Sequence, residues 1–163
     1  PFLKRVPPLP QLGLGAAWAW AVPMAFAAER GQLPAALWLI FTAVILWTLA
    51  FDTYYGMVDR EDDLKIGIKS TAILFGRYDL AMIALLQLVT LALLFAAGLH
   101  FERGLIYTAG LLVAGGCFVK QHLQARHRNR EVYFRAFLNN NLVGLVIFIA
   151  LSADYFFRPQ GFL

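Results

Sequence analysis

Apolar runs of membrane length dominate this sequence. A helix needs about 20 mostly apolar residues to cross the hydrocarbon core of a bilayer. Five such stretches follow one another along the 163 residues, at about 9–28, 35–57, 79–99, 104–119 and 137–157. Because lipid offers no partner to backbone N–H and C=O groups, such runs form helices. The sequence therefore predicts an all-α fold, a polytopic transmembrane helical bundle that forms a single membrane domain over residues 1–163.

Composition supports an integral membrane protein over a soluble one. Hydrophobic residues make up 60% of the chain and charged residues 15%, against about 45–50% and 25% in soluble domains. The net charge of +4 is modest, and the basic residues segregate by connection. We therefore expect the lipid bilayer as the surrounding medium and no nucleic acid as a partner, while the oligomeric state stays open.

The basic residues predict which side of the membrane each connection occupies. Of the 14 Lys and Arg residues, eleven fall on one side of a five-span topology and three on the other. The eleven are Lys4, Arg5, Arg60, Lys65, Lys69, Arg77, Lys120, Arg126, Arg128, Arg130 and Arg135. Since connections rich in Lys and Arg stay in the cytoplasm, this side is predicted to be cytoplasmic.

Half of the acidic residues crowd into one stretch at the end of the second span. Of the ten Asp and Glu residues, five are Asp52, Asp59, Glu61, Asp62 and Asp63. If a helix continues through them, Asp59 and Asp63 lie about 20° on either side of Asp52 and one turn apart. Carboxylates at this spacing repel each other, so we expect a compensating cation.

Oxygen ligands of this kind suit Mg²⁺, which takes one or two carboxylates and completes its shell with water and phosphate oxygens. Lys65 and Lys69 follow at a spacing of one turn and suit phosphate. The pattern indicates a metal-diphosphate site at a membrane surface. A charged cytoplasmic loop that obeys the same charge bias is an equally open interpretation. Asp52, just inside an apolar helix end, needs a cavity, a cation or a partner.

A longer motif gives the pattern a family resemblance. Residues 51–76, FDTYYGMVDREDDLKIGIKSTAILFG, resemble the second Asp-rich motif of the UbiA superfamily of intramembrane prenyltransferases. Further similar segments are PFLKR at 1–5, PQLGLGAAWAWAVPMAFAA at 10–28 and FRAFLNNNLVGLV at 134–146. The resemblance covers essentially the whole chain.

This resemblance implies both an architecture and a reaction. It implies that the chain supplies five transmembrane helices of a nine-helix UbiA-type fold, as its C-terminal part. The activity implied is Mg²⁺-dependent transfer of a polyprenyl group from polyprenyl diphosphate to 4-hydroxybenzoate in ubiquinone biosynthesis. The location implied is the bacterial inner (plasma) membrane, with the metal site on the cytoplasmic side.

The resemblance also assigns roles to residues. Asp59 and Asp63 would bind the metal, and Lys4 matches the lysine of a Tyr-x-x-x-Lys element; these three are the expected catalytic residues. The expected diphosphate contacts are Lys4, Arg5, Lys65 and Lys69, and the expected supporting residues behind the ligands are Asp52, Asp62 and Asn140. The family's first Asp-rich motif, an Asn/Asp-x-x-x-Asp that lies on an earlier helix of the family fold, is not present in these residues, which carry only the second motif. We therefore expect the chain alone to be inactive.

Two other classes of protein are alternatives to this interpretation. A CDP-alcohol phosphotransferase also places Asp residues at a membrane helix end, but its motif begins Asp-Gly-x-x-Ala-Arg, and here Asp59 is preceded by FDTYYGMV. A non-enzymatic cation-binding membrane protein would carry ionisable residues in the middle of its spans, along a pathway. The carboxylates of this chain lie at one end instead.

Overall fold

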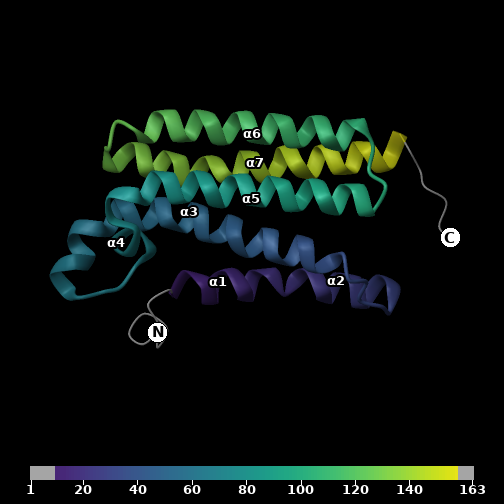
Figure 1. The fold of residues 1–163 in the computed structure, drawn as a ribbon, viewed down its shortest axis with the longest axis horizontal. Coiled ribbons are helices and arrows are strands. Elements are labelled where there is room, and N and C mark those ends of the chain that lie inside the picture. The colour runs from purple at the N-terminus through teal and green to yellow at the C-terminus, as the bar shows by residue number, and fades with distance from the viewer. Residues whose placement is uncertain (1–9, 158–163) are drawn as a thin grey trace.

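The computed structural model describes residues 10–157, and every regular element within them is a helix. The elements are α1 (Pro10–Ala19), α2 (Ala21–Arg30), α3 (Leu37–Ile66), α4 (Thr71–Phe75), the short 3₁₀ helix η2 (Gly76–Tyr78), α5 (Asp79–His100), α6 (Leu105–Ala125) and α7 (Arg130–Phe157). The long helices lie side by side, with α1 and α2 along one flank of α3 and α4 at one end of the bundle (Figure 1). This confirms the predicted all-α bundle.

The first predicted span is a broken helix. α1 begins at Pro10, and α2 begins at Ala21 after an interruption at Trp20. Pro23 lacks an N–H group, and its ring crowds the carbonyl four residues earlier, which belongs to Ala19. The break in the helix therefore falls three residues before the proline itself.

Three helices in residues 10–157 are long and apolar enough to cross a membrane: α3, the segment Thr71–His100 that contains α5, and α7. The other two predicted spans correspond to α6 and to the pair α1–α2. Each helix of that pair has ten residues, and α6 ends in the polar run from Lys120 to Gln124. The count of five spans remains a prediction.

The helices extend beyond the predicted spans at one end of the bundle. α3 continues past residue 57 to Ile66, and α6 continues past residue 119 to Ala125. α7 begins at Arg130 rather than at residue 137. Polar residues end the apolar run without ending the helix, because no Pro or Gly interrupts these segments. The basic stretch 120–135 is therefore mostly helical, and its connection consists of residues 126–129.

Small residues allow the helices to approach closely. A Cβ atom added at Gly110 of α6 would lie 2.1 Å from the Cβ of Ala150 in α7. Likewise, a Cβ at Gly98 of α5 would lie 2.4 Å from the ring of Tyr107. Gly110 therefore sets the separation of α6 and α7, as small residues do in membrane helix pairs.

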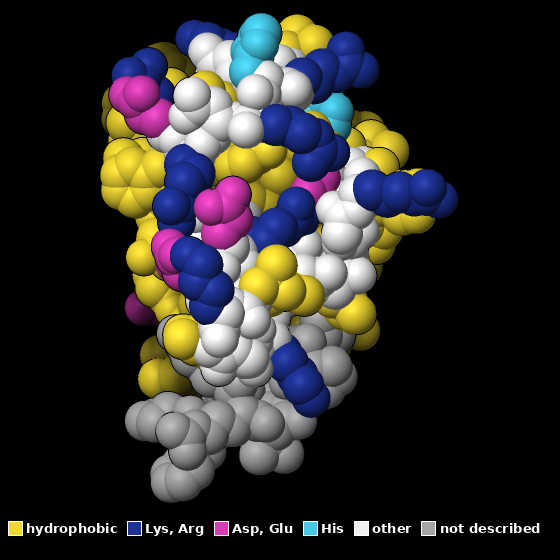
Figure 2. Space-filling model, turned by 90° about the vertical axis from the view of Figure 1, so that its left-hand side faces the viewer, with side chains coloured by type: hydrophobic (Ala, Val, Ile, Leu, Met, Phe, Trp, Pro, Cys, Tyr) yellow, Lys and Arg dark blue, Asp and Glu magenta, His cyan; other side chains and the backbone are white. Residues whose placement is uncertain are grey.

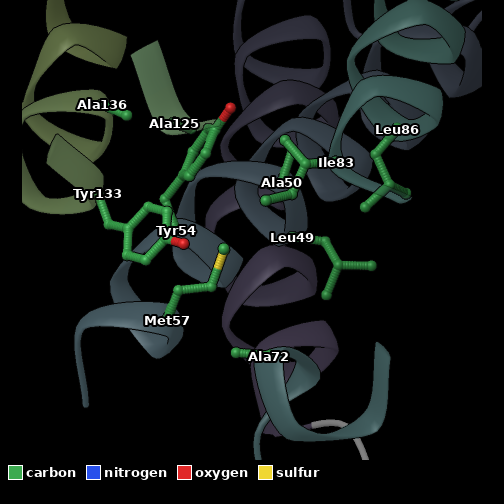
Figure 3. Packing of buried hydrophobic residues seen from close by; sticks show 10 residues of the cluster. All are labelled: Leu49, Ala50, Tyr54, Met57, Ala72, Ile83, Leu86, Ala125, Tyr133 and Ala136. Carbon is green, nitrogen blue, oxygen red and sulfur yellow. The ribbon is translucent and has the colours of Figure 1, made fainter. Parts of the chain in front are cut away.

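A buried cluster around Tyr54 joins α3, α5, α6 and α7 near the end that carries α4. Figure 3 shows Tyr54 and Met57 of α3 beside Tyr133 of α7, with Ile83 and Leu86 on α5. This cluster fixes the position of the last turns of α3, where the acidic stretch begins.

At the opposite end, a side chain of α7 caps α6. The carboxylate of Asp154 is 1% exposed and accepts hydrogen bonds from the backbone N–H of Gly104, at 2.8 Å, and of Tyr107, at 3.3 Å. The first N–H groups of a helix have no partner within it, and a carboxylate there is also favoured by the helix dipole. Asp154 therefore ties α6 to α7.

Candidate functional site

The charged end of the bundle, which comprises residues 58–80 and 120–135, gathers the last turns of α3, α4, the start of α5, the end of α6 and the start of α7. Lys and Arg side chains spread over this face, with acidic side chains between them (Figure 2). Lys4 and Arg5, two expected diphosphate contacts, lie outside the described residues. The predicted grouping of basic connections at one end is therefore present in the part of the chain that is described.

α3 runs without a break through the acidic stretch. It ends at Ile66, and Gly67 adopts a left-handed conformation with φ of 70° and donates its N–H to the carbonyl of Asp63. The condition on which the carboxylate stripe depends is thus met, and helical geometry places Asp59 and Asp63 one turn apart. Both residues are partly buried, as is Asp52 two turns earlier.

Asp62 is held by basic residues of the chain itself. Its carboxylate accepts from Lys65 Nζ at 3.3 Å and from Arg130 Nη2 at 2.7 Å. Arg130 also donates to the carbonyl of Val58 at 2.7 Å. Both ion pairs are exposed, so each contributes little to stability. The sequence interpretation named only a metal as the compensating cation, and the structure adds an arginine from the start of α7.

Lys69 lies in the connection between α3 and α4 and is exposed. The next residues are anchored: the Ser70 side chain caps α4 by accepting from the N–H of Ile73, at 3.4 Å. The hydroxyl groups of Thr71 and Thr53 lie 2.7 Å apart, which joins this connection to α3. Lys69 is therefore an exposed cation directly before two residues that are anchored to α3 and α4.

Asn140, an expected supporting residue, lies away from the acidic stripe. Its side-chain oxygen accepts from Trp47 Nε1 at 2.9 Å, and its amide donates to the carbonyl of Ala136. Trp47 precedes Asp59 by twelve residues of α3, which corresponds to about 18 Å along the helix. In this arrangement Asn140 joins α7 to α3 and does not contact the carboxylates at 59 and 63.

Sequence reasoning missed the most buried charge of this end. Asp79, the first residue of α5, has 0% exposure and accepts from Arg60 Nη2 at 2.7 Å and from both terminal nitrogens of Arg128 at 3.3 Å. The hydrogen bond and charge of Asp79 raise the pKa of the Arg128 guanidinium. In the sequence Asp79 resembles an ordinary helix start, and only its place before a long apolar run hints at burial.

The described residues form cavities both at this cluster and away from it. One of about 210 Å³ lies beside this cluster, lined by Met57, Val58, Arg60, Glu61, Arg128, Arg130 and Tyr133. An apolar groove of about 710 Å³ runs between α5 and α6, lined by leucines together with Phe95, Phe118 and others.

Comparison with known proteins identifies the family of this chain. Residues 1–151 match the UbiA prenyltransferase family. The chain belongs to this family. A 4-hydroxybenzoate octaprenyltransferase of Aliivibrio fischeri (strain MJ11) is 56% identical over 97% of the chain and 55% of the relative. One of Saccharophagus degradans is 55% identical over 94% of the chain and 52% of the relative.

The fold agrees with a solved member of the family. The apo structure of a UbiA homolog from Aeropyrum pernix K1 superposes with a TM-score of 0.77 at 25% identity, covering 93% of this chain and 57% of that one. The chain thus spans about half the length of the curated relatives that it matches. Apolar helices and UbiA family membership together make it an integral membrane protein. The family match also argues against a CDP-alcohol phosphotransferase.

The donor set of the acidic stretch fits part of a site for a divalent cation. UbiA prenyltransferases use a divalent metal, and carboxylate oxygens are the ligands that Mg²⁺ prefers. In residues 10–157, no group of three or more His, Cys, Asp or Glu side chains is arranged to hold a metal ion. The described part of the chain therefore offers the carboxylates of one motif toward such a site.

Proposed function

We propose that this chain is the part of a 4-hydroxybenzoate polyprenyltransferase that carries the second Asp-rich motif. The enzyme transfers a polyprenyl group from polyprenyl diphosphate to 4-hydroxybenzoate, with Mg²⁺, in ubiquinone biosynthesis. Its charged end faces the cytoplasm of a bacterial inner membrane. We call the protein that combines this chain with the rest of the relatives' length the complete enzyme, and we expect the chain by itself to be inactive.

The observation that carries the proposal is the unbroken course of α3 through Asp52, Asp59 and Asp63. A helix presents these residues as one stripe. Asp59 and Asp63 have the Asp-x-x-x-Asp spacing of the family's second motif. We assign Asp59 and Asp63 as metal ligands, and Asp52 and Asp62 as groups that support them. Lys65, Lys69, Lys4 and Arg5 are assigned to the diphosphate.

The reaction breaks the bond between the allylic carbon and the diphosphate oxygen and forms a bond from that carbon to the ring carbon ortho to the phenol. The ring proton is then lost and aromaticity returns. Bound Mg²⁺ would neutralise the negative charge that develops on the departing diphosphate. The lysines act in the same direction, because preorganised positive groups stabilise a developing anion. The apolar surroundings exclude water from the allylic cation.

Substitution in the complete enzyme tests the ligand assignment. Asp59→Ala should lower turnover by at least a hundredfold at saturating Mg²⁺, measured as prenylated 4-hydroxybenzoate formed in detergent or nanodiscs. Glu131→Ala is the matched control, because this carboxylate is exposed at the same end of the bundle and pairs with Arg135. Near-normal turnover of Asp59→Ala would refute the assignment.

A further inference from the structure

The start of α5 contains a fully buried carboxylate, whose burial must be compensated by charged or hydrogen-bonding partners. Asp79 has 0% exposure and bonds to the guanidinium groups of Arg60 and Arg128. It also accepts from the N–H of Leu80 at 2.6 Å. Removing a carboxylate from water is costly unless it is paired and hydrogen-bonded. Asp79 is fully paired, and its partners come from α3 and from the connection between α6 and α7.

Arg60 extends this pairing to α4. The same Nη2 atom that contacts Asp79 donates to the carbonyl of Ala72 and, at 3.2 Å, to that of Gly76. These carbonyls belong to the start of α4 and to the residue just after it. The two hydrogens of this Nη2 group are thus shared among the carbonyls at both ends of α4 and the carboxylate of Asp79, which orients the group.

The same face of α3 receives the rest of the connection. Thr53 bonds to Thr71, and a Cβ at Gly56 would lie 3.3 Å from Ala72. Thr53, Gly56 and Arg60 are spaced by three and four residues, so they form one face of the helix. Asp59 lies about 100° around the helix from Arg60. The docked face is therefore next to the carboxylate stripe.

Lys69 immediately precedes this docked segment. Lys69 lies outside any helix. The position of its backbone therefore depends on the anchored residues Ser70 and Thr71 that follow it. Any shift of α4 along α3 would therefore move Lys69 relative to Asp59 and Asp63.

From these contacts we propose that Asp79 is a positioning residue for the prenyl-transfer site. It acts through Arg60, which holds α4 on α3 and so sets the separation between Lys69 and the carboxylate stripe. Arg128 adds a second guanidinium to the same carboxylate and so joins the connection between α6 and α7 to the same point. This inference rests on the proposed function, because it assumes that the stripe and Lys69 bind metal and diphosphate.

Asp79→Asn in the complete enzyme tests the proposal, since asparagine keeps the shape and removes the charge that holds both arginines. We expect the KM for polyprenyl diphosphate and the Mg²⁺ concentration for half-maximal activity to rise on the order of tenfold, as when residues that orient metal ligands are replaced. Hydrogen–deuterium exchange should increase in residues 68–78.

Asp154→Asn is the matched control. Asp154 is equally buried and also accepts two hydrogen bonds, but at the opposite end of the bundle. The Asp154→Asn variant should have a lower unfolding temperature but an unchanged KM and an unchanged Mg²⁺ requirement.

Arg128→Gln provides a second test that leaves the buried carboxylate in place. Because Arg128 is about half exposed, this variant should fold, and its KM and Mg²⁺ requirement should rise by less than in Asp79→Asn.

The positioning role and the proposed function predict different outcomes. Increases in KM and in the Mg²⁺ requirement for Asp79→Asn, absent from Asp154→Asn, support the positioning role. The role would be overturned if Asp79→Asn yields less folded enzyme but the folded fraction keeps its KM and its Mg²⁺ requirement. If Asp79→Asn does not fold at all, an unchanged KM and Mg²⁺ requirement in Arg128→Gln would overturn it. Failure of the proposed function itself has a different signature, namely retained turnover of Asp59→Ala.

Discussion

The close approach of α6 and α7 at Gly110 yields a quantitative prediction. An added Cβ would lie 2.1 Å from the Cβ of Ala150, whereas carbon atoms in contact prefer about 3.5–4.0 Å. α6 and α7 would therefore have to separate by roughly 1.5 Å or more. Neither methyl group can rotate away, so the strain must be taken up by the backbone.

The expected cost follows from this geometry. Overpacking of a tight interior costs about 1–3 kcal/mol, and the upper end applies where backbones must move. Replacing a helical glycine by alanine returns about 1 kcal/mol of helix propensity. Gly110→Ala should therefore destabilise the complete enzyme by a net amount of about 2 kcal/mol, seen as a lower unfolding temperature in detergent micelles.

Two further variants decide whether the contact is the cause. Gly116 also lies in α6 but has no atom within 4 Å of an added Cβ, so Gly116→Ala should be neutral or stabilising by up to about 1 kcal/mol. In an Ala150→Gly background the clash disappears, and Gly110→Ala should then no longer destabilise. Equal effects of Gly110→Ala in both backgrounds would refute the reasoning. The Mg²⁺ requirement should not change.

Three other predictions concern the charged end and its support. Chelation with EDTA should abolish prenyl transfer by the complete enzyme, and added Mg²⁺ should restore it; activity that persists in EDTA would contradict the metal proposal. Trp47→Phe removes the donor to Asn140 and leaves a buried oxygen unpaired, so we expect a loss of about 1–3 kcal/mol in thermal unfolding, and an unchanged unfolding temperature would contradict it. Ser70→Ala removes the cap of α4 and should cost about 1 kcal/mol locally, visible as faster hydrogen exchange at Ile73 and contradicted by unaltered exchange there.

Some parts of the candidate site could be predicted from the sequence because they depend on spacing along one helix. Asp59 and Asp63 are four residues apart, and α3 has no interruption before Gly67, so their relation needs no tertiary information. The break near Pro23 is of the same kind, because a proline removes a particular hydrogen bond. The placement of Asn140 beside Trp47 depends instead on how α7 rotates against α3, and the sequence interpretation had put it behind the metal ligands.

Local sequence determined the membrane character of this protein, its helices and the acidic stripe, because hydropathy and helical spacing act over a few neighbouring residues. Tertiary structure decided which charges are paired. Arg128 lies 49 positions after Asp79 in the sequence, and Arg60 lies 19 positions before it, so nothing in their immediate neighbours indicates that the three residues meet. Only the packing of α3, α5 and α7 around Tyr54 brings these helix ends together, and burial then makes the pairing obligatory.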